Sequence, residues 1–187
     1  DQGFHGHRGP VREHLDLDRV RFVAGDLRNR DDLRVAMTGQ DAVVHLAADT
    51  RVMDSIEDPG FNFENNVIGT FNLLELSREL GIRRIVAAST GGAILGDVTP
   101  PVHEEMAPQP TSPYGASKLM LEGYLSAFSA SYGLSGCALR FSNIYGPRSF
   151  HKGSVVAAFY KKLLAGESLE VFGDGSQARD YLYLGDL

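Results

Sequence analysis

Tyr114 and Lys118 are the residues whose types and spacing point most clearly to chemistry. They lie four positions apart, in the run Tyr-Gly-Ala-Ser-Lys, and residues at this spacing share one face of a helix. A free phenol has a pKa near ~10, too high for a base at neutral pH, and a cation about 4–6 Å away lowers that value. The pair therefore predicts a proton-transfer device for a sugar or alcohol hydroxyl, in which Lys118 lowers the pKa of Tyr114.

Length, charge and composition narrow the classes of protein. The chain has 187 residues, 43% of them hydrophobic and 22% charged, which suits one domain, or one domain and part of another. Its net charge of −6 argues against nucleic acid as the main partner. Cys137, the single cysteine, fits a reducing compartment, and no apolar run approaches the ~18–20 residues of a membrane span. We expect a cytoplasmic protein with no membrane partner.

Apolar segments typical of strands alternate with segments of helical period. Strands are predicted at 20–24, 41–48, 84–88, 137–141 and 169–172, and helices at 31–37, 62–80, 113–133 and 154–164. This alternation predicts an α/β fold, with right-handed βαβ units around a mostly parallel sheet. Segment 41–48 is continuously apolar, which is typical of a strand buried on both faces. His45 lies within this apolar strand and is therefore expected to be a packed core histidine.

Polar and small residues follow several of these strands. The strand ends carry Asp26, Ala47-Ala48, Ser89-Thr90 and Ser142-Asn143. In a parallel sheet, ligands bind at the carboxyl ends of the strands. The helix of Tyr114 and Lys118 comes after the third of these ends. The topology therefore predicts that hydroxyls, a phenol and an ammonium meet in one crevice, although they lie far apart in sequence.

Seven short blocks resemble those of one known family. They are Gly-Asp-Leu at 25–27, His-Leu-Ala-Ala at 45–48, Asn-Asn-Val-Ile-Gly-Thr at 65–70, Ser-Thr at 89–90, Tyr-Gly-Ala-Ser-Lys at 114–118, Asn-Ile-Tyr-Gly-Pro-Arg at 143–148 and Gly-Asp-Gly-Ser-Gln-Ala-Arg-Asp at 173–180. By their order and spacing, the sequence resembles the extended short-chain dehydrogenase/reductases. Within that group it is similar to the NAD-dependent nucleotide-sugar epimerases and dehydratases of the UDP-glucose 4-epimerase type.

The resemblance implies a Rossmann-like, doubly wound parallel sheet with bound NAD. Residues 1–142 would form a partial NAD-binding domain, and 143–187 the start of a small sugar-nucleotide-binding domain. The family's opening strand and its T-G-x-x-G-x-x-G turn have no counterpart here, so we expect an internal fragment without the first two strands. On this interpretation Asp1 binds the adenosine ribose, and the isolated 187 residues bind NAD poorly and have no turnover.

The implied active site consists of Thr90, Tyr114 and Lys118. Tyr114 would take the proton from the sugar C4 hydroxyl while hydride leaves C4. Thr90 would hydrogen-bond the same oxygen, and Lys118 would also bind the nicotinamide ribose. Alignment on the preceding strand places Thr90 at the catalytic hydroxyl, with Ser89 as the alternative. Counting back from the following loop would place Gly91 there instead.

The resemblance also implies binding residues on both sides of the site. The implied cofactor contacts are Asp1, Asp26, Leu27, Leu46, Ala47, Ala48, Asn66, Tyr114, Lys118 and Phe141, with Asp26 and Leu27 on the adenine side and Asn66 as an anchor near the cofactor. The implied sugar-nucleotide contacts are Thr90, Asn143, Arg148, Val171, Phe172 and Arg179, with His151 and Lys152 adding positive charge. Among these, Asn143 and Arg179 match diphosphate contacts, and Val171 and Phe172 match the edge of the uracil pocket. No metal ligands are expected.

The activity implied is NAD-dependent epimerisation of a UDP-sugar at C4, through a transient 4-keto sugar. Related elimination enzymes need an acid after the catalytic hydroxyl, whereas Gly-Gly-Ala occupies 91–93 here, which favours epimerisation. The alternatives are another NAD-dependent sugar-nucleotide enzyme (a reductase, a UDP-glucuronate epimerase or a dehydratase) and a non-catalytic NAD-binding scaffold. A homodimer is implied for the full-length protein. The apolar stripe Phe63, Val67, Phe71 and Leu74 would serve either the core or the dimer interface.

Overall fold

The computed structural model describes residues 20–147, 149–150 and 153–187. The predicted contacts Asp1, Arg148, His151 and Lys152 lie outside the described residues. The chain divides into two compact units, Asp1–Arg140 and Phe141–Leu187, and each is described by itself. The functional division into an NAD-binding domain up to 142 and a sugar-nucleotide domain beyond it stays a prediction.

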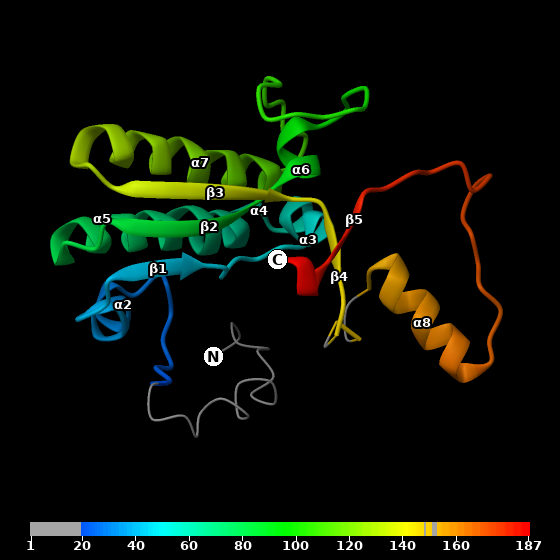
Figure 1. Ribbon diagram of the computed structural model, residues 1–187, viewed down its shortest axis with the longest axis horizontal. Helices are drawn as coiled ribbons and strands as arrows, with labels where there is room; N and C mark the ends of the chain where they lie inside the picture. Colours follow the sequence, from blue (N-terminus) through cyan, green and yellow to red (C-terminus); the bar gives the residue numbers. More distant parts are fainter. Residues whose placement is uncertain (1–19, 148, 151–152) are drawn as a thin grey trace. The chain divides into compact units, whose positions relative to one another are not determined.

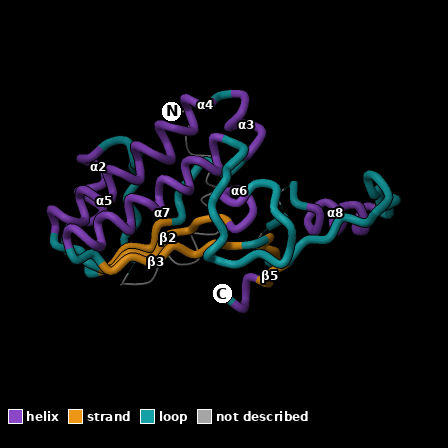
Figure 2. The backbone as a smooth tube through the Cα atoms, turned by 90° about the horizontal axis from the view of Figure 1, so that it is seen from above, coloured by secondary structure: helices purple, strands orange, loops and turns teal. Residues whose placement is uncertain are grey.

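The first unit is built on a three-stranded sheet. The strands β1 (Ala42–His45), β2 (Arg84–Thr90) and β3 (Ser135–Phe141) lie in the order β1-β2-β3. β1 and β2 are parallel, with Ala42 opposite Arg84. Figures 1 and 2 show the helices α5 (Gly69–Leu80) and α7 (Pro113–Tyr132) running along one face of this sheet. The predicted α/β architecture with a parallel sheet is confirmed.

The core of this unit lies between the sheet and its helices. Helix α2 (Arg30–Met37) packs on α5, and α7 packs on both α5 and β2. The core includes Leu33, Met37, Leu73, Leu74, Leu76, Ile82, Ile85, Ala87, Leu121, Leu125, Phe128 and Leu134. Burying each large apolar side chain contributes roughly 1.5–3 kcal/mol, so α7 is held firmly against the strand ends. None of the described helices combines the length and the apolarity that a membrane crossing requires.

The ends of α5 and α7 lie where local sequence signals predict them. Pro113 occupies the first turn of α7, and the Ser112 hydroxyl accepts a hydrogen bond from the Gly115 amide (3.1 Å). Gly81 follows the last residue of α5 and Gly133 the last residue of α7, with φ of 74° and 68°. These left-handed backbone conformations favour glycine, which explains why the chain stops both helices at these positions.

The segment before α5 differs from the single helix predicted for 62–80. It consists of α3 (Val52–Glu57), α4 (Pro59–Asn62) and the π-helix η1 (Phe63–Ile68). The Gly69 amide donates to the carbonyl of Glu64, five residues back, which is the π-helical pattern. Asn66 lies within this wider turn and is buried. Single π turns often mark functional sites, because they redirect side chains that an α-helix would place elsewhere.

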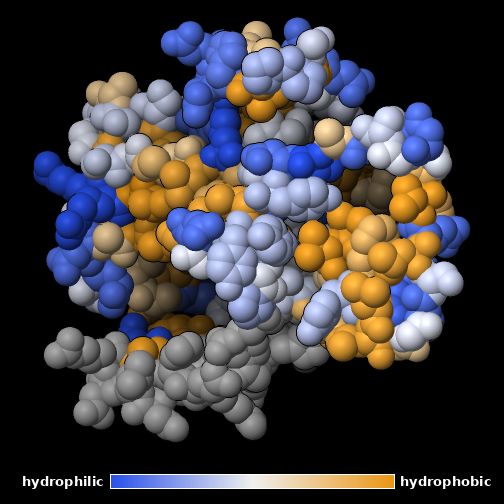
Figure 3. Space-filling view, turned by 45° about the vertical axis from the view of Figure 1, so that its right-hand side comes forward, coloured by the Kyte–Doolittle hydropathy of each residue, from blue (hydrophilic) through white to orange (hydrophobic). Residues whose placement is uncertain are grey.

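The second unit is small and carries a strand pair that the sequence did not predict. Its elements are β4 (Asn143–Tyr145), α8 (Val155–Ala165), β5 (Tyr181–Tyr183) and the short 3-10 helix η2 (Leu184–Asp186). β4 and β5 pair in parallel, with Asn143 opposite Tyr181. Figure 3 shows apolar side chains gathered on the surface of this unit. On α8 the exposed ones are Val155, Val156, Tyr160, Leu163 and Leu164.

Three strand predictions need correction. Segments 20–24 and 169–172, both expected as strands, have no strand partner among the described residues and therefore lack the ladder of hydrogen bonds that defines a strand. β1 is shorter than the predicted 41–48. Val44 and Leu46 are 67% and 63% exposed, so burial of this strand on both faces is wrong for the described part of the chain. The helices α5 and α7 cover only the opposite face.

Candidate active site

Tyr114 and Lys118 lie in the first turns of α7, beside the carboxyl end of β2. Tyr114 is half-buried, and its backbone amide donates to Ser55 Oγ (3.2 Å). Lys118 is 4% exposed, and its Nζ donates to the backbone carbonyl of Ala88 (2.8 Å). The ammonium of the predicted pair is therefore fixed to the end of the strand that carries the predicted catalytic hydroxyl.

Thr90 and Ser89, the two candidates for the catalytic hydroxyl, have different partners, and Thr90 as the catalytic one stays a prediction. The Thr90 hydroxyl acts on the Tyr114 phenol in the direction that lowers the pKa of Tyr114. Thr90 Oγ1 also accepts from the Ala93 amide (3.5 Å) and caps the short helix α6 (Gly91–Leu95). Ser89 is buried and donates to Glu122 Oε1 (2.6 Å). The structure thus brings Thr90 to the phenol, while Ser89 is engaged elsewhere.

The pKa of Tyr114 is shifted in the direction opposite to the expected one. Burial raises the pKa of Tyr114, the hydrogen bond from Thr90 partly offsets this, and the negative charge of Asp49 raises it further. The expected lowering by Lys118 is not found. Burial lowers the pKa of Lys118 itself to about 8, and its ammonium is directed to the strand carbonyl. In this structure the phenol is therefore a proton donor at neutral pH.

Asp49 is a site residue that sequence reasoning missed. Its backbone amide donates to Asn66 Oδ1 and its carbonyl accepts from Asn66 Nδ2, both at 2.8 Å. Asn66 Nδ2 also donates to Ser117 Oγ (3.1 Å), which in turn donates to the Tyr114 carbonyl (2.8 Å). This buried chain of hydrogen bonds ties the end of β1 to the helix of Tyr114. The sequence feature that could have identified Asp49 is its position directly after the predicted strand 41–48, where ligands bind in a parallel sheet.

His45 is a buried core histidine, as its position in an apolar strand predicted. It is 4% exposed, and its Nε2 lies 2.9 Å from Thr70 Oγ1. Burial and the positive charge of Lys118 lower the pKa of His45 to about 4. The ring is therefore neutral at pH 7, and protonation would place a second cation beside Lys118.

Stability is expected to fall on acidification because of His45. The unfolded chain binds a proton near the ordinary pKa of 6.5 and the folded chain only near about 4, so stability is full at pH 7 and decreases between these values. Chemical denaturation of the described chain is expected to give about 2 kcal/mol less stability at pH 5 than at pH 7. His45→Asn should remove most of this difference. An equal difference in both proteins would contradict the account.

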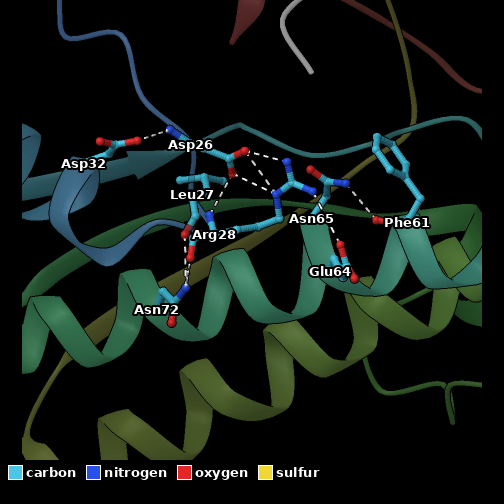
Figure 4. Close-up of polar contacts among 8 residues, drawn as sticks. All are labelled: Asp26, Leu27, Arg28, Asp32, Phe61, Glu64, Asn65 and Asn72. Carbon is cyan, nitrogen blue, oxygen red and sulfur yellow. Dashed lines mark hydrogen bonds and ion pairs between the residues drawn. The ribbon is translucent and has the colours of Figure 1, made fainter. Parts of the chain in front are cut away.

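Asp26 and Leu27, the predicted adenine-side pair, lie in a loop held by polar contacts (Figure 4). The Asp26 carboxylate accepts from the Arg28 amide (2.8 Å) and from Arg28 Nη2 (2.6 Å), which lowers the pKa of Asp26. Arg28 also pairs with Glu64 (3.5 Å). Asn72 Nδ2 donates to the carbonyls of Leu27 and Arg28, both at 3.2 Å. The carboxylate is thus ionised and fixed in direction.

The strand ends of the first unit offer groups that fit a dinucleotide. Asp26 provides a carboxylate, and the Lys118 ammonium has three N–H donors, of which Ala88 takes one. Exposed or half-buried residues at these ends include Leu46, Ala47 and Ala48. Small side chains there permit close approach of a ligand to the backbone. The residues therefore fit NAD, with Asp26 toward adenine and Lys118 toward the nicotinamide ribose, and this assignment stays a prediction. Phe141, a further predicted cofactor contact, is the first residue of the second unit, and its role stays a prediction.

The predicted diphosphate contacts Asn143 and Arg179 lie in the second unit, near one another along paired strands. The Asn143 amide and Nδ2 both donate to the Asp180 carbonyl (3.2 and 3.1 Å). Arg179 is the preceding residue and is exposed, with Nη1 donating to the Ala178 carbonyl (2.7 Å). Pairing of β4 with β5 therefore brings Asn143 to Asp180, the residue next to Arg179 in the sequence.

A pocket of about 420 Å³ lies within the second unit. It is lined by Tyr145, Gly146, Pro147, Ser149, Phe150, Val156, Ala157, Tyr160 and Tyr183. Val171 and Phe172, the predicted edge of the uracil pocket, do not line it and are 58% and 78% exposed. Their role stays a prediction. Nowhere in the described residues do three or more His, Cys, Asp or Glu side chains gather as a metal site would require.

Comparison with known proteins places this geometry in a family. The family model described as "NAD dependent epimerase/dehydratase family" matches residues 5–187. A putative UDP-glucose 4-epimerase of Methanocaldococcus jannaschii is 40% identical over 173 residues, which cover 90% of this chain and 57% of that protein. The chain therefore spans a little over half the length of this relative.

Solved structures agree with the sequence comparison. The UDP-glucose 4-epimerase of Thermus thermophilus, in complex with NAD, has a TM-score of 0.84 at 41% identity, over 94% of this chain and 60% of that chain. A double mutant of the dTDP-glucose 4,6-dehydratase DesIV from Streptomyces venezuelae has a TM-score of 0.87 at 34% identity, over 97% and 56%. From its sequence, its parallel sheet and these relatives, the chain belongs to the NAD-dependent epimerase/dehydratase family.

Proposed function

We propose that the protein containing this chain epimerises a UDP-sugar at C4 through a transient 4-keto sugar, with NAD as its bound cofactor. The observation that carries the proposal is the Lys118 ammonium on the Ala88 carbonyl, which brings the helix of Tyr114 to the strand end that carries Thr90. Thr90 also acts on the Tyr114 phenol in the direction that lowers its pKa. Two hydroxyls and a cation so placed can hold one sugar oxygen and exchange its proton. The named relatives support the choice of sugar nucleotide.

Each residue has a distinct part in this chemistry. Bound NAD supplies the hydride acceptor and donor and, when oxidised, a positive charge that favours the phenolate. Tyr114 then accepts the proton of the C4 hydroxyl and returns it after the keto sugar has turned its other face. Thr90 hydrogen-bonds the same sugar oxygen and keeps it aligned with the phenol. Lys118 holds its ammonium at the end of β2, where it attracts ribose hydroxyls.

A 4,6-dehydratase is the second candidate, and Asp49 is the observation that favours it. No acid follows Thr90, since α6 begins with Gly91 and Gly92. However, the charge of Asp49 acts on Tyr114, so a carboxylate from another strand end lies near the phenol. Elimination needs a carboxyl group in such a position, beside the leaving hydroxyl. Asp49→Asn would then abolish elimination, whereas epimerisation needs no acid at this position.

Incubating the full-length protein with UDP-galactose and analysing the products tests the proposal. UDP-glucose is the expected product. A 4-keto-6-deoxy sugar nucleotide would establish the second candidate, and no UDP-glucose would overturn the first. That the 187 residues alone have no turnover stays a prediction, to be checked in the same assay.

Formation of a homodimer by the full-length protein remains part of the proposal. The apolar stripe considered for its interface has one side chain in the core and another on the surface. Leu74 is 2% exposed and belongs to the core, whereas Phe63 is 53% exposed. Phe71 makes edge contacts with the rings of Tyr124 (5.3 Å) and Phe128 (6.3 Å). These contacts join α5 to α7, and Tyr124 remains 41% exposed beside them. An apolar surface formed by two helices supports pairing with a second copy.

A further inference from the structure

Glu122 is a half-buried carboxylate on α7, two turns beyond Tyr114 and one turn beyond Lys118. Its Oε1 accepts from Ser89 Oγ (2.6 Å) and Arg140 Nε (3.0 Å), and its Oε2 accepts from Arg140 Nη2 (2.7 Å). The side chains of Glu122 and Arg140 are only 15% and 20% exposed. Such a bidentate pair has a fixed geometry, unlike a flexible surface ion pair.

The Glu122 cluster, defined as Ser89, Glu122 and Arg140, joins three elements of the first unit. Ser89 belongs to β2, Glu122 to α7 and Arg140 to β3. Arg140 Nη1 also donates to the Glu104 carbonyl (3.0 Å), in the loop that connects α6 to α7. One carboxylate thus anchors two strands, the catalytic helix and the loop above them. No other role for these three side chains follows from the proposed mechanism.

Ionisation of Glu122 keeps the cluster together. Burial raises the pKa of Glu122, but hydrogen bonds from Arg140 and Ser89, with the charge of Arg140, outweigh burial and leave the pKa below its ordinary value. A buried charge that loses its partner is strongly destabilising. The cluster is therefore closed, and removing one member leaves another without its partner.

Ser89 and Thr90 are consecutive in β2, so the position of one side chain constrains the other. Ser89 continues the buried face of Ile85 and Ala87, and successive side chains of a strand point to opposite faces. When the Ser89 hydroxyl is held on Glu122, the end of β2 cannot rotate about its axis. The direction of the Thr90 side chain is consequently fixed as well. Because Glu122 is on the same helix as Tyr114, the cluster also sets how far the phenol lies from Thr90.

We infer that Glu122 is a positioning residue, which acts through Ser89 and Arg140 to hold the Thr90 hydroxyl against the Tyr114 phenol. The inference deepens the proposed function and rests on it. Glu122 touches neither Tyr114 nor Lys118 in any hydrogen bond described above, so its effect is transmitted by the strand and the helix. The hydrogen bond from Thr90 favours the phenolate, so the titration of Tyr114 reports on whether that bond is held.

The test is a spectroscopic titration of the Tyr114 phenol in the full-length protein, which requires no turnover. Tyrosinate absorbance is measured against pH for each variant, and again for the same variant with Tyr114→Phe added. The difference between the two curves is the titration of Tyr114 alone. Thr90→Val is expected to raise the pKa of Tyr114 by about 0.5 to 1, the value of one lost hydrogen bond. Ser89→Ala and Glu122→Gln are expected to raise it in the same direction.

Two features of this set separate positioning from other effects. Removing the negative charge of Glu122 would by itself lower the pKa of Tyr114, so a rise cannot come from the lost charge. Ser89→Ala leaves every charge in place, and it still tests the inference where Glu122→Gln fails to fold. Glu79→Gln is the matched control, because Glu79 accepts from Arg30 and Arg34 (2.5 and 2.6 Å) between α2 and α5. It is expected to leave Tyr114 unchanged.

The outcomes distinguish this inference from the proposed function. A rise in Thr90→Val that is absent in Ser89→Ala and Glu122→Gln overturns the positioning role and leaves the Thr90–Tyr114 pair intact. A rise in none of the three variants overturns both, because Thr90 would then not act on the phenol. A rise in Glu79→Gln of the same size would show a general loss of rigidity and would also overturn the inference.

Discussion

Replacing Tyr114 by Phe in the full-length protein is expected to lower kcat by about 10²- to 10⁴-fold, with little change in KM. The substitution removes the hydroxyl that exchanges the C4 proton, and proton transfer by a positioned side chain contributes rate enhancements of about that size. Ring packing and the bond from the Tyr114 amide to Ser55 are retained, so substrate binding should persist. Steady-state kinetics with UDP-galactose measure both constants.

Tyr124→Phe is the matched control for this substitution. Tyr124 lies on the same helix, and its ring packs on Phe71 and Phe128 rather than in the candidate site. Tyr124→Phe removes the same phenolic hydroxyl as Tyr114→Phe. An equal loss of kcat in both variants would therefore assign the effect to a disturbance of the helix rather than to the Tyr114 hydroxyl. Full activity of Tyr114→Phe would revive the interpretation as a non-catalytic NAD-binding scaffold.

Gly115→Ala is expected to be the most disruptive single-methyl change in the catalytic helix. A Cβ at this position would overlap the backbone carbonyl oxygen of Ala93 and press on Pro110. Backbone cannot move aside as a flexible side chain does, so overpacking is expected to cost about 1–3 kcal/mol. The start of α7 would move away from α6, and with it Tyr114 away from Thr90. Chemical denaturation measures the loss.

Gly123→Ala, in the same helix, is expected to stabilise the protein rather than destabilise it. Gly123 is exposed, and a Cβ there would meet nothing within 4 Å. Because alanine favours a helix interior over glycine, this variant is expected to gain about 1 kcal/mol. If Gly115→Ala were equally stabilising, the close contact between α7 and α6 would be contradicted.

Features that depend on neighbouring residues could be predicted from the sequence. Pro113 and Gly133 bound α7 because a proline favours a first turn and a glycine accepts a left-handed backbone. The spacing of Tyr114 and Lys118 predicted that they share one face of a helix, and the βαβ order predicted that this helix lies beside the strand ends. His45 was expected in the core from its apolar strand, and it is buried there.

Features that depend on tertiary contacts could not be predicted in this way. The π turn of η1 and the pairing of β4 with β5 have no local pattern, since both depend on segments distant in sequence. The pKa of Tyr114 was expected to fall because spacing alone suggested a cation beside it. The structure adds burial and the charge of Asp49, and these oppose the expected shift. Neither is encoded in a four-residue spacing.

The most direct test of the central claim is the fate of the C4 hydrogen of the sugar. The full-length protein is incubated with UDP-galactose that carries deuterium at C4, and the products are examined by mass spectrometry and by NMR at the C4 position. Epimerisation through a 4-keto sugar in a closed site predicts UDP-glucose that retains deuterium at C4. Loss of the label to solvent, or its appearance at C6 of a deoxy sugar, would contradict the account.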